Sequence, residues 1–217
     1  LTHDEDVDDL HIPLLLWWAI ERKLDTGREE LMALVNDPAV WKLKIFSRII
    51  AERIGMRLTA DQGPNKHYTL KQGVYSGWLI ERWPPYLRRN LEACARLLQA
   101  APSEADADLL VAGMAAGLTG RPVESVPQNL KEVMGNLWTS RPHSAHLVSL
   151  AARLGQPAAL PEAVAMVRGG KVKGADQDEL LDLFAATGSA DAIPLVADLL
   201  RNEKNETRRR KLLDVLD

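Results

Sequence analysis

The sequence predicts an all-α protein built of antiparallel helix pairs, and three observations support this prediction. Alanine, leucine, glutamate, lysine and arginine dominate the 217 residues, whereas phenylalanine occurs twice and tyrosine three times. Strands favour aromatic and β-branched residues with a period of two, so little or no sheet is expected. Helix start and stop signals recur along the chain and leave short turns between helices. A segment of the C-terminal third also repeats after 33 positions.

The first predicted helix follows an acidic segment and ends near residue 23. Asp8 or Asp9 can accept hydrogen bonds from its first backbone amides, as N-cap aspartates do. Trp17 and Trp18 are separated by about 100° around this helix. We therefore expect one of them in the core and the other at a contact with a neighbouring helix or domain.

Two further helix starts are predicted before residue 58. Thr26 can cap residues 27–35, with Glu29 in the capping-box position. Asp37 followed by Pro38 predicts the next start. One apolar stripe marks the expected buried face of that helix: Trp41, Ile45, Ile49 and Ile54.

Glycine and proline interrupt the helical pattern around residues 59–88, which predicts an irregular insertion or junction. Regular helices are predicted beyond it at 87–100, 103–118, 127–139, 142–154, 160–167, 176–186, 190–201 and from 206 onward. We therefore expect three regions: N-terminal repeats over 1–58, the insertion at 59–88, and C-terminal repeats over 89–217. The two repeat regions are expected to form one continuous solenoid.

Seven positions of the C-terminal third recur 33 residues later. The first set is Leu150, Gly155, Ala159, Leu160, Pro161, Val167 and Arg168, and the second is Leu183, Gly188, Ala192, Ile193, Pro194, Leu200 and Arg201. A shift of 32 also aligns residues 179–183 with 211–215. Because one helix pair cannot bury its whole apolar face, neighbouring pairs must stack. The repeat therefore predicts a HEAT-like α-solenoid with right-handed stacking, and a non-repeating helical bundle is the alternative.

Composition excludes several classes of protein. The formal net charge of −3 disfavours broad affinity for nucleic acid. Cys94 is the single cysteine, which excludes a disulfide framework, a zinc finger and covalent haem attachment. The longest apolar run has nine residues, whereas a bilayer needs about 20. We expect no membrane span and no cofactor in this segment.

Residues 8–21, with the tryptophan pair that follows His11, and residues 37–41 resemble a stretch of large secreted proteins of planctomycetes and related bacteria. These proteins are described as membrane-bound dehydrogenases or haem-binding proteins. The resemblance implies a sugar-dehydrogenase-like propeller, HEAT-like helices in the middle and a c-type cytochrome domain, with this chain matching the middle part. It also implies a periplasmic or other extracytoplasmic location, with other domains of the parent chain or another protein as partners.

The sequence departs from that family in the parts that carry its chemistry. It has no Cys-x-x-Cys-His motif and no propeller strands, so neither a haem site nor a dehydrogenase site transfers to any residue. The chain opens on Leu1 and closes within an apolar helical pattern, which we interpret as a segment of a longer polypeptide. The resemblance therefore predicts a helical spacer between redox domains.

Two groups of residues could bind a metal ion, and for both we favour a structural interpretation. The acidic segment lacks the glycine and the closing glutamate of a calcium loop, so it is expected to be a solvated helix N-terminus. Its members are Asp4, Glu5, Asp6, Asp8 and Asp9. His143 and His146 are spaced as two zinc ligands on one helix face, yet no third ligand is evident. We interpret them as a surface residue and a partly buried residue.

Two segments rich in lysine or arginine could bind an anion. Residues 169–174 combine glycine and lysine but lack the spacing of a P-loop and a preceding strand, which favours an inter-helix loop. Residues 208–211, termed the basic cluster, face Glu203 and Glu206 at helical distance. We expect the basic cluster to be solvated or to contact a following repeat.

Nucleophilic catalysis has little support in the sequence. Ser140, Ser144 and Ser149 lie near the two histidines, but no Gly-x-Ser-x-Gly elbow occurs. Cys94 lies in an apolar helix without an adjoining cationic cluster, so it is expected to be a packed small residue. We predict no catalytic residue in this segment.

The sequence favours a non-catalytic helical-repeat scaffold or protein-interaction segment of a larger extracytoplasmic redox protein. The residues predicted to make interactions are His11, Trp17, Trp18, Trp41, Trp83 and Trp138. A third possibility, an autonomous protein-binding adaptor, requires an exposed apolar strip.

The alternative function is a HEAT-like DNA-binding enzyme similar to the alkylpurine DNA glycosylases, which hold damaged DNA on a concave surface. Trp41, Trp83 and Trp138, with the arginines around Arg82 and Arg88, would supply that surface. It requires a strongly positive groove that contains at least two tryptophans.

Overall fold

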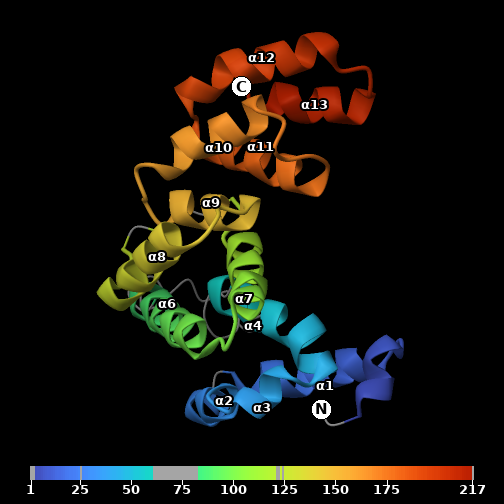
Figure 1. Ribbon diagram of the computed structural model, residues 1–217, viewed down its shortest axis with the longest axis vertical. Coiled ribbons are helices and arrows are strands. Elements are labelled where there is room, and N and C mark those ends of the chain that lie inside the picture. Colours follow the sequence, from blue (N-terminus) through green and yellow to red (C-terminus); the bar gives the residue numbers. More distant parts are fainter. Residues whose placement is uncertain (1–2, 25, 61–82, 121–122, 124, 217) are drawn as a thin grey trace, which may run out of the picture. The chain divides into compact units, whose positions relative to one another are not determined.

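The computed structural model describes residues 3–24, 26–60, 83–120, 123 and 125–216, with the side chains of 83–86 left out. Within these residues every regular element is helical and no strand is found (Figure 1), so the predicted all-α class is confirmed. The chain divides into two compact units, one formed by Leu1–Gly117 with Ser125–Asn136 and the other by Leu118–Glu124 with Leu137–Asp217. None of the described helices has the length and apolar character needed to cross a membrane.

The described helices divide between the two units. The first unit contains η1 (Asp4–Asp8), α1 (Ile12–Lys23), α2 (Arg28–Val35), α3 (Pro38–Trp41), the π-helical turn η2 (Phe46–Ile50), α4 (Ala51–Ala60), α6 (Trp83–Ala100) and α7 (Glu104–Gly117). Helix α8 (Gln128–Ser140) comes next in the sequence. The second unit contains α9 (Ala145–Arg153), α10 (Ala159–Arg168), α11 (Ala175–Thr187), η4 (Ala190–Ala192), α12 (Ile193–Asn202) and α13 (Glu206–Asp214).

Side-chain caps fix several of the predicted helix starts. Asp37 accepts a hydrogen bond from the Ala39 amide and starts α3, as predicted. Ser144 accepts from the Leu147 amide, so α9 begins at Ala145 rather than at residue 142. The prediction that Thr26 caps the second helix is wrong, because Gly27 holds the N-cap position without a side-chain hydrogen bond.

A π-helical turn changes which residues of the next helix face the core. The predicted stripe is correct for Trp41, Ile45 and Ile54, which are buried. It is wrong at Ile49, which is only partly buried, whereas Ile50 is fully buried. The turn η2 adds a residue to the helical repeat, so the buried face shifts by one position there.

Helices α4 and α7 of the first unit lie side by side (Figure 1), and their backbones approach closely. A β-carbon built on Gly113 of α7 would lie 1.9 Å from the Glu52 carbonyl oxygen of α4. One on Gly117 would lie 2.5 Å from the Met56 carbonyl oxygen. The Thr59 hydroxyl donates to the Gly55 carbonyl at 2.9 Å and also lies 3.2 Å from the Met114 carbonyl of α7. Only glycine permits this approach of the two backbones.

The predicted irregular stretch at 59–88 is helical at both of its ends. Helix α4 continues to Ala60, and α6 begins at Trp83 with two prolines in its first turn, where proline is tolerated. Residues 61–82 lie outside the described part of the chain. The predicted regions 1–58, 59–88 and 89–217, with one continuous solenoid, therefore stay a prediction.

The two copies of the sequence repeat have matching local structure. Gly155 and Gly188 both have positive φ, at +84° and +58°, and follow the ends of α9 and α11. Ala159 and Ala192, one repeat apart, are both fully buried. Helix α11 contacts α9, α10 and α13, and α12 contacts α13 (Figure 1).

The glycine-lysine segment 169–174 is the connection between α10 and α11. The Lys171 amide donates to the Met166 carbonyl at 3.1 Å, and the Gly170 amide donates to the Val167 carbonyl at 3.2 Å. These two bonds end α10 in the manner of a Schellman cap, with Gly170 at φ +64°. The segment is an inter-helix loop, as predicted.

Candidate functional site

Helix α1 starts at a turn in which the carboxylate of Asp9 holds two backbone amides. Its Oδ1 atom accepts hydrogen bonds from the amides of His11 at 2.8 Å and Ile12 at 2.9 Å. These bonds lower the pKa of Asp9 and confirm the predicted capping role of this residue. The His11 side chain makes no capping hydrogen bond.

The two adjacent tryptophans of α1 lie on different sides of the helix, as expected. Trp17 is buried, at 6% exposure, and the Arg53 guanidinium lies 6.0 Å from its ring centroid. Trp18 is 55% exposed. Trp17 therefore belongs to the core of the first unit, and Trp18 is available for a contact.

Trp18 belongs to an exposed face of α1 that also contains an aliphatic side chain. His11, Leu15, Trp18 and Arg22 are all exposed and follow the spacing of one helix face, and we call them the α1 stripe. Leu15 is 55% exposed, and the neighbouring Leu10 is 82% exposed. The sequence reasoning missed Leu15 and Arg22, although their spacing from His11 was the available signal.

Helix α1 follows an acidic segment and carries two cations in its last turn. Arg22 and Lys23 form the last turn of α1, both are exposed, and neither pairs with a carboxylate among the described residues. The acidic segment precedes the helix, and its Asp4 Oδ1 accepts a hydrogen bond from the Lys44 amide at 3.0 Å. The stripe is therefore an apolar centre with a cationic C-terminal end.

The other predicted interaction residues occupy different environments. Trp41 is buried at 4% exposure, and its indole NH donates to the Val35 carbonyl at 2.7 Å. Trp138 is partly buried against the core of the second unit and stacks on His143 with 3.9 Å between ring centroids. The side chain of Trp83 lies outside the described residues.

The two histidines that are spaced as zinc ligands have separate partners. His143 Nε2 lies 2.9 Å from the Trp138 carbonyl oxygen, whereas His146 Nδ1 lies 2.5 Å from a carboxylate oxygen of Glu179. Among the described residues no group of three or more His, Cys, Asp or Glu side chains is arranged to hold a metal ion. The two side chains act as structural contacts within the second unit.

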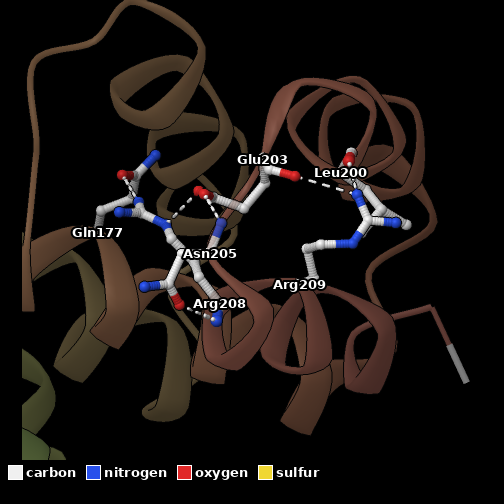
Figure 2. Close-up of polar contacts among 6 residues, drawn as sticks. All are labelled: Gln177, Leu200, Glu203, Asn205, Arg208 and Arg209. Carbon is white, nitrogen blue, oxygen red and sulfur yellow. Dashed lines mark hydrogen bonds and ion pairs between the residues drawn. The ribbon is translucent and has the colours of Figure 1, made fainter.

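The basic cluster makes contacts within the chain rather than forming a solvated face throughout (Figure 2). Arg208 pairs with Glu203 at 3.3 Å and donates to the Gln177 amide oxygen of α11. Arg209 donates to the carbonyl oxygens of Leu200 at 3.2 Å and Glu203 at 3.0 Å, which closes the turn between α12 and α13. The predicted pairing with Glu203 is confirmed.

Of the candidate nucleophiles, Ser140 is exposed at the end of α8, and the others are buried or cap a helix. Ser144 caps α9, and Ser149 is fully buried. Cys94 is also fully buried, and burial raises the pKa of its thiol to about 12. A thiol in this environment is inert.

Cys94 should react with a thiol reagent only when the chain unfolds. A pKa of about 12 leaves about one thiolate in ten thousand at pH 8, and burial removes access as well. We expect native labelling to be at least about a thousandfold slower than labelling in urea. Fast release of the chromophore from a disulfide reagent in native buffer would contradict the burial of Cys94.

Arginines from two helices meet in a cleft of the first unit that the sequence did not predict. The cleft has a volume of about 460 Å³ and is termed the arginine cleft. Its lining residues are Arg28, Glu29, Arg88, Arg89, Glu92, Ala93, Arg96, Pro127, Gln128 and Asn129. Arg88 was named with the DNA-binding alternative, and Arg82 lies outside the described residues.

Comparison with protein-family models, with curated proteins and with solved structures gave no match. The function is therefore argued from the α1 stripe, the arginine cleft and the helix contacts of the second unit.

Proposed function

We propose that this chain is a non-catalytic helical-repeat segment that docks a partner protein through the α1 stripe. The main observation in support of this proposal is that Leu15 and Trp18 are each 55% exposed on one face of α1. Exposing a large aromatic and a leucine side by side leaves apolar surface in water, which a partner would cover. Trp is also the side chain most enriched at the centre of protein interfaces.

The two cations at the C-terminal end of α1 define the chemistry of the partner. Arg22 and Lys23 would meet carboxylates at the edge of an interface, where charge sets orientation and association rate. We propose an amphipathic helix with an apolar face and acidic residues at the end that lies against Arg22. Such a helix would bury its apolar residues on Leu15 and Trp18.

A HEAT-like solenoid is the architecture that we propose for the second unit. One supporting contact joins equivalent positions of successive repeats: His146 lies against Glu179, 33 residues later, at 2.5 Å. Lys211 aligns with Glu179 after the shift of 32, and it pairs at 3.0 Å with Asp182, which lies three residues beyond Glu179 in α11. Equivalent side chains lie next to one another when repeats stack in register.

A larger extracytoplasmic redox protein is our proposal for the parent chain. Its support is the resemblance of residues 8–21 and 37–41 described above. In that setting the partner helix would belong to another domain of the parent or to a separate protein. The DNA-binding alternative is not favoured, because the described lining of the arginine cleft contains two glutamates and no tryptophan.

The docking proposal is tested with a helical peptide that carries leucines on one face and glutamates at one end. Binding is measured by fluorescence anisotropy of the labelled peptide. We expect the double variant Leu15→Ser with Trp18→Ser to weaken binding by at least about tenfold, since two apolar anchors are lost. The matched control is Leu213→Ser, which removes a 47% exposed leucine from α13 and should leave the affinity unchanged.

A charge-swap experiment tests the orientation of the partner. Replacing Arg22 and Lys23 by glutamate should transfer the preference from the peptide with terminal glutamates to one with terminal lysines. Equal affinity of all variants for both peptides would overturn the proposal. So would a concentration-dependent dimer that the Leu15 and Trp18 substitutions abolish, because the occupant would then be a second copy.

A further inference from the structure

The arginine cleft is formed by α2, α6 and the start of α8, and all three segments belong to the first unit. Four guanidinium groups and two carboxylates line it, so its formal charge is +2 within a chain of net charge −3. Its volume of about 460 Å³ lies in the range of small-molecule sites. A local excess of positive charge in a slightly acidic chain points to an anionic ligand.

A buried asparagine fixes the position of one of these arginines. Asn90 is fully buried in α6, and its amide nitrogen donates to the Leu58 carbonyl at 3.0 Å. Its side-chain oxygen accepts a hydrogen bond of 2.5 Å from Nη2 of Arg28. Arg28 is thereby held at the cleft before any ligand arrives, which reduces the entropic cost of binding.

The remaining arginines of the cleft differ in whether they form ion pairs with its glutamates. Glu29 accepts two parallel hydrogen bonds from Arg96, at 3.0 and 3.1 Å, and Glu92 pairs with Arg88 at 3.2 Å. Both pairs are largely exposed and therefore weak. Arg89 is exposed and pairs with no carboxylate among the described residues.

The N-terminus of helix α8 contributes residues to the lining of the same cleft. The first intrahelical hydrogen bonds are donated by Leu130 and Lys131 to the Pro127 carbonyl, each at 3.1 Å. Gln128 and Asn129, which begin the helix, are among the residues that line the cleft. The positive end of the helix dipole adds to the guanidinium groups.

We propose that the arginine cleft binds the dianionic phosphate group of a small phosphomonoester. A phosphomonoester carries a charge of about −1.5 to −2 near neutral pH. This charge is opposite in sign and similar in size to the formal charge of +2 of the cleft. Guanidinium groups bind phosphate oxygens through two parallel hydrogen bonds, which the exposed Arg89 can supply, and Arg28 adds a fixed positive charge. The remaining volume would hold the organic part of the ligand. This site is separate from the α1 stripe, so either proposal can fail without the other.

The test is isothermal titration calorimetry with phenyl phosphate and with inorganic phosphate at constant ionic strength. Arg89→Gln should weaken binding by about tenfold, because one charge-assisted contact is lost. Glu29→Gln should tighten binding by about threefold, since it releases Arg96 for the ligand. Arg168→Gln is the matched control: it removes one exposed arginine of the second unit and should leave the affinity unchanged.

Comparing the two affinities also distinguishes an organic phosphate ligand from free phosphate. Tighter binding of phenyl phosphate than of inorganic phosphate supports an organic ligand, and the reverse order supports free phosphate in the same cleft. Absence of saturable binding by either, or equal affinities of Arg89→Gln and Arg168→Gln, would overturn the proposal. A DNA duplex that binds more tightly than phenyl phosphate and loses affinity on Arg89→Gln would replace the phosphomonoester by a nucleic-acid backbone.

Discussion

Replacing Gly113 by alanine is expected to lower the free energy of unfolding by about 3 kcal/mol. The new β-carbon would lie 1.9 Å from the carbonyl oxygen of Glu52 and 3.0 Å from the amide nitrogen of Met56. Both atoms belong to the backbone of α4, so no side-chain rotation can relieve the clash. Helices α4 and α7 would have to separate, which would loosen the buried Ile54 and Leu110 between them.

The measurement is urea denaturation followed by the helical circular dichroism signal, with Gly135→Ala as the matched control. Gly135 lies in the interior of α8, and a β-carbon added to it would meet no atom within 4 Å. Alanine there should raise the free energy of unfolding by about 0.5–1 kcal/mol, because it favours the helix without a clash. The same chemical change should therefore have opposite signs at the two sites.

An unchanged or raised urea midpoint for Gly113→Ala would contradict the close crossing of α4 and α7. Gly117→Ala provides an independent check, since its β-carbon would lie 2.5 Å from the Met56 carbonyl oxygen. Loss of stability in both variants would locate the effect in the crossing rather than in one strained residue.

Local signals explain why the helix boundaries could be predicted from the sequence. Asp9 and Asp37 act on amides two or three residues away, and Gly155 and Gly188 end helices through their own backbone conformation. Such effects need no knowledge of tertiary structure. Thr26 was predicted as a cap from its residue type and from the spacing to Glu29, but the helix begins one residue later, with Gly27 at the N-cap.

Contacts between distant residues explain what the sequence did not predict. The spacing of Gly113 and Gly117 was visible, but their partners Glu52 and Met56 lie in another helix, and only the fold brings them together. The shift from Ile49 to Ile50 likewise arises from a π-helical turn that no residue type marks. A prediction of the buried face from α-helical periodicity alone therefore fails at Ile49.

The two candidate sites also differ in whether local signals or distant contacts form them. His11 and Trp18 could be predicted because an α1 stripe follows from helical spacing alone. The arginine cleft could not, since Arg28 and Arg89 are brought together by the contact of α2 with α6. Asn90, which positions Arg28, has no sequence signature that distinguishes it from a surface asparagine.

The second large effect is expected at Phe184, whose replacement by alanine should cost about 3–5 kcal/mol of unfolding free energy. Phe184 is fully buried in α11, within a cluster to which α9, α10, α12 and α13 all contribute. Deleting the ring leaves a cavity that the surrounding helices can fill only in part. Ile193→Ala is the control, because Ile193 is 49% exposed on α12 and should change stability by about 0.5 kcal/mol or less.

Amide hydrogen exchange of Phe184→Ala also tests whether the repeats share one core. If successive helix pairs stack as proposed, the lost contacts of α11 weaken its neighbours on both sides. Exchange in α9 and α13 should then accelerate together with that of α11, by about a hundredfold or more. Acceleration confined to α11 and α12 would contradict a continuous core, because each pair would then be stable without its neighbours, and the solenoid proposed for the second unit would have to be abandoned.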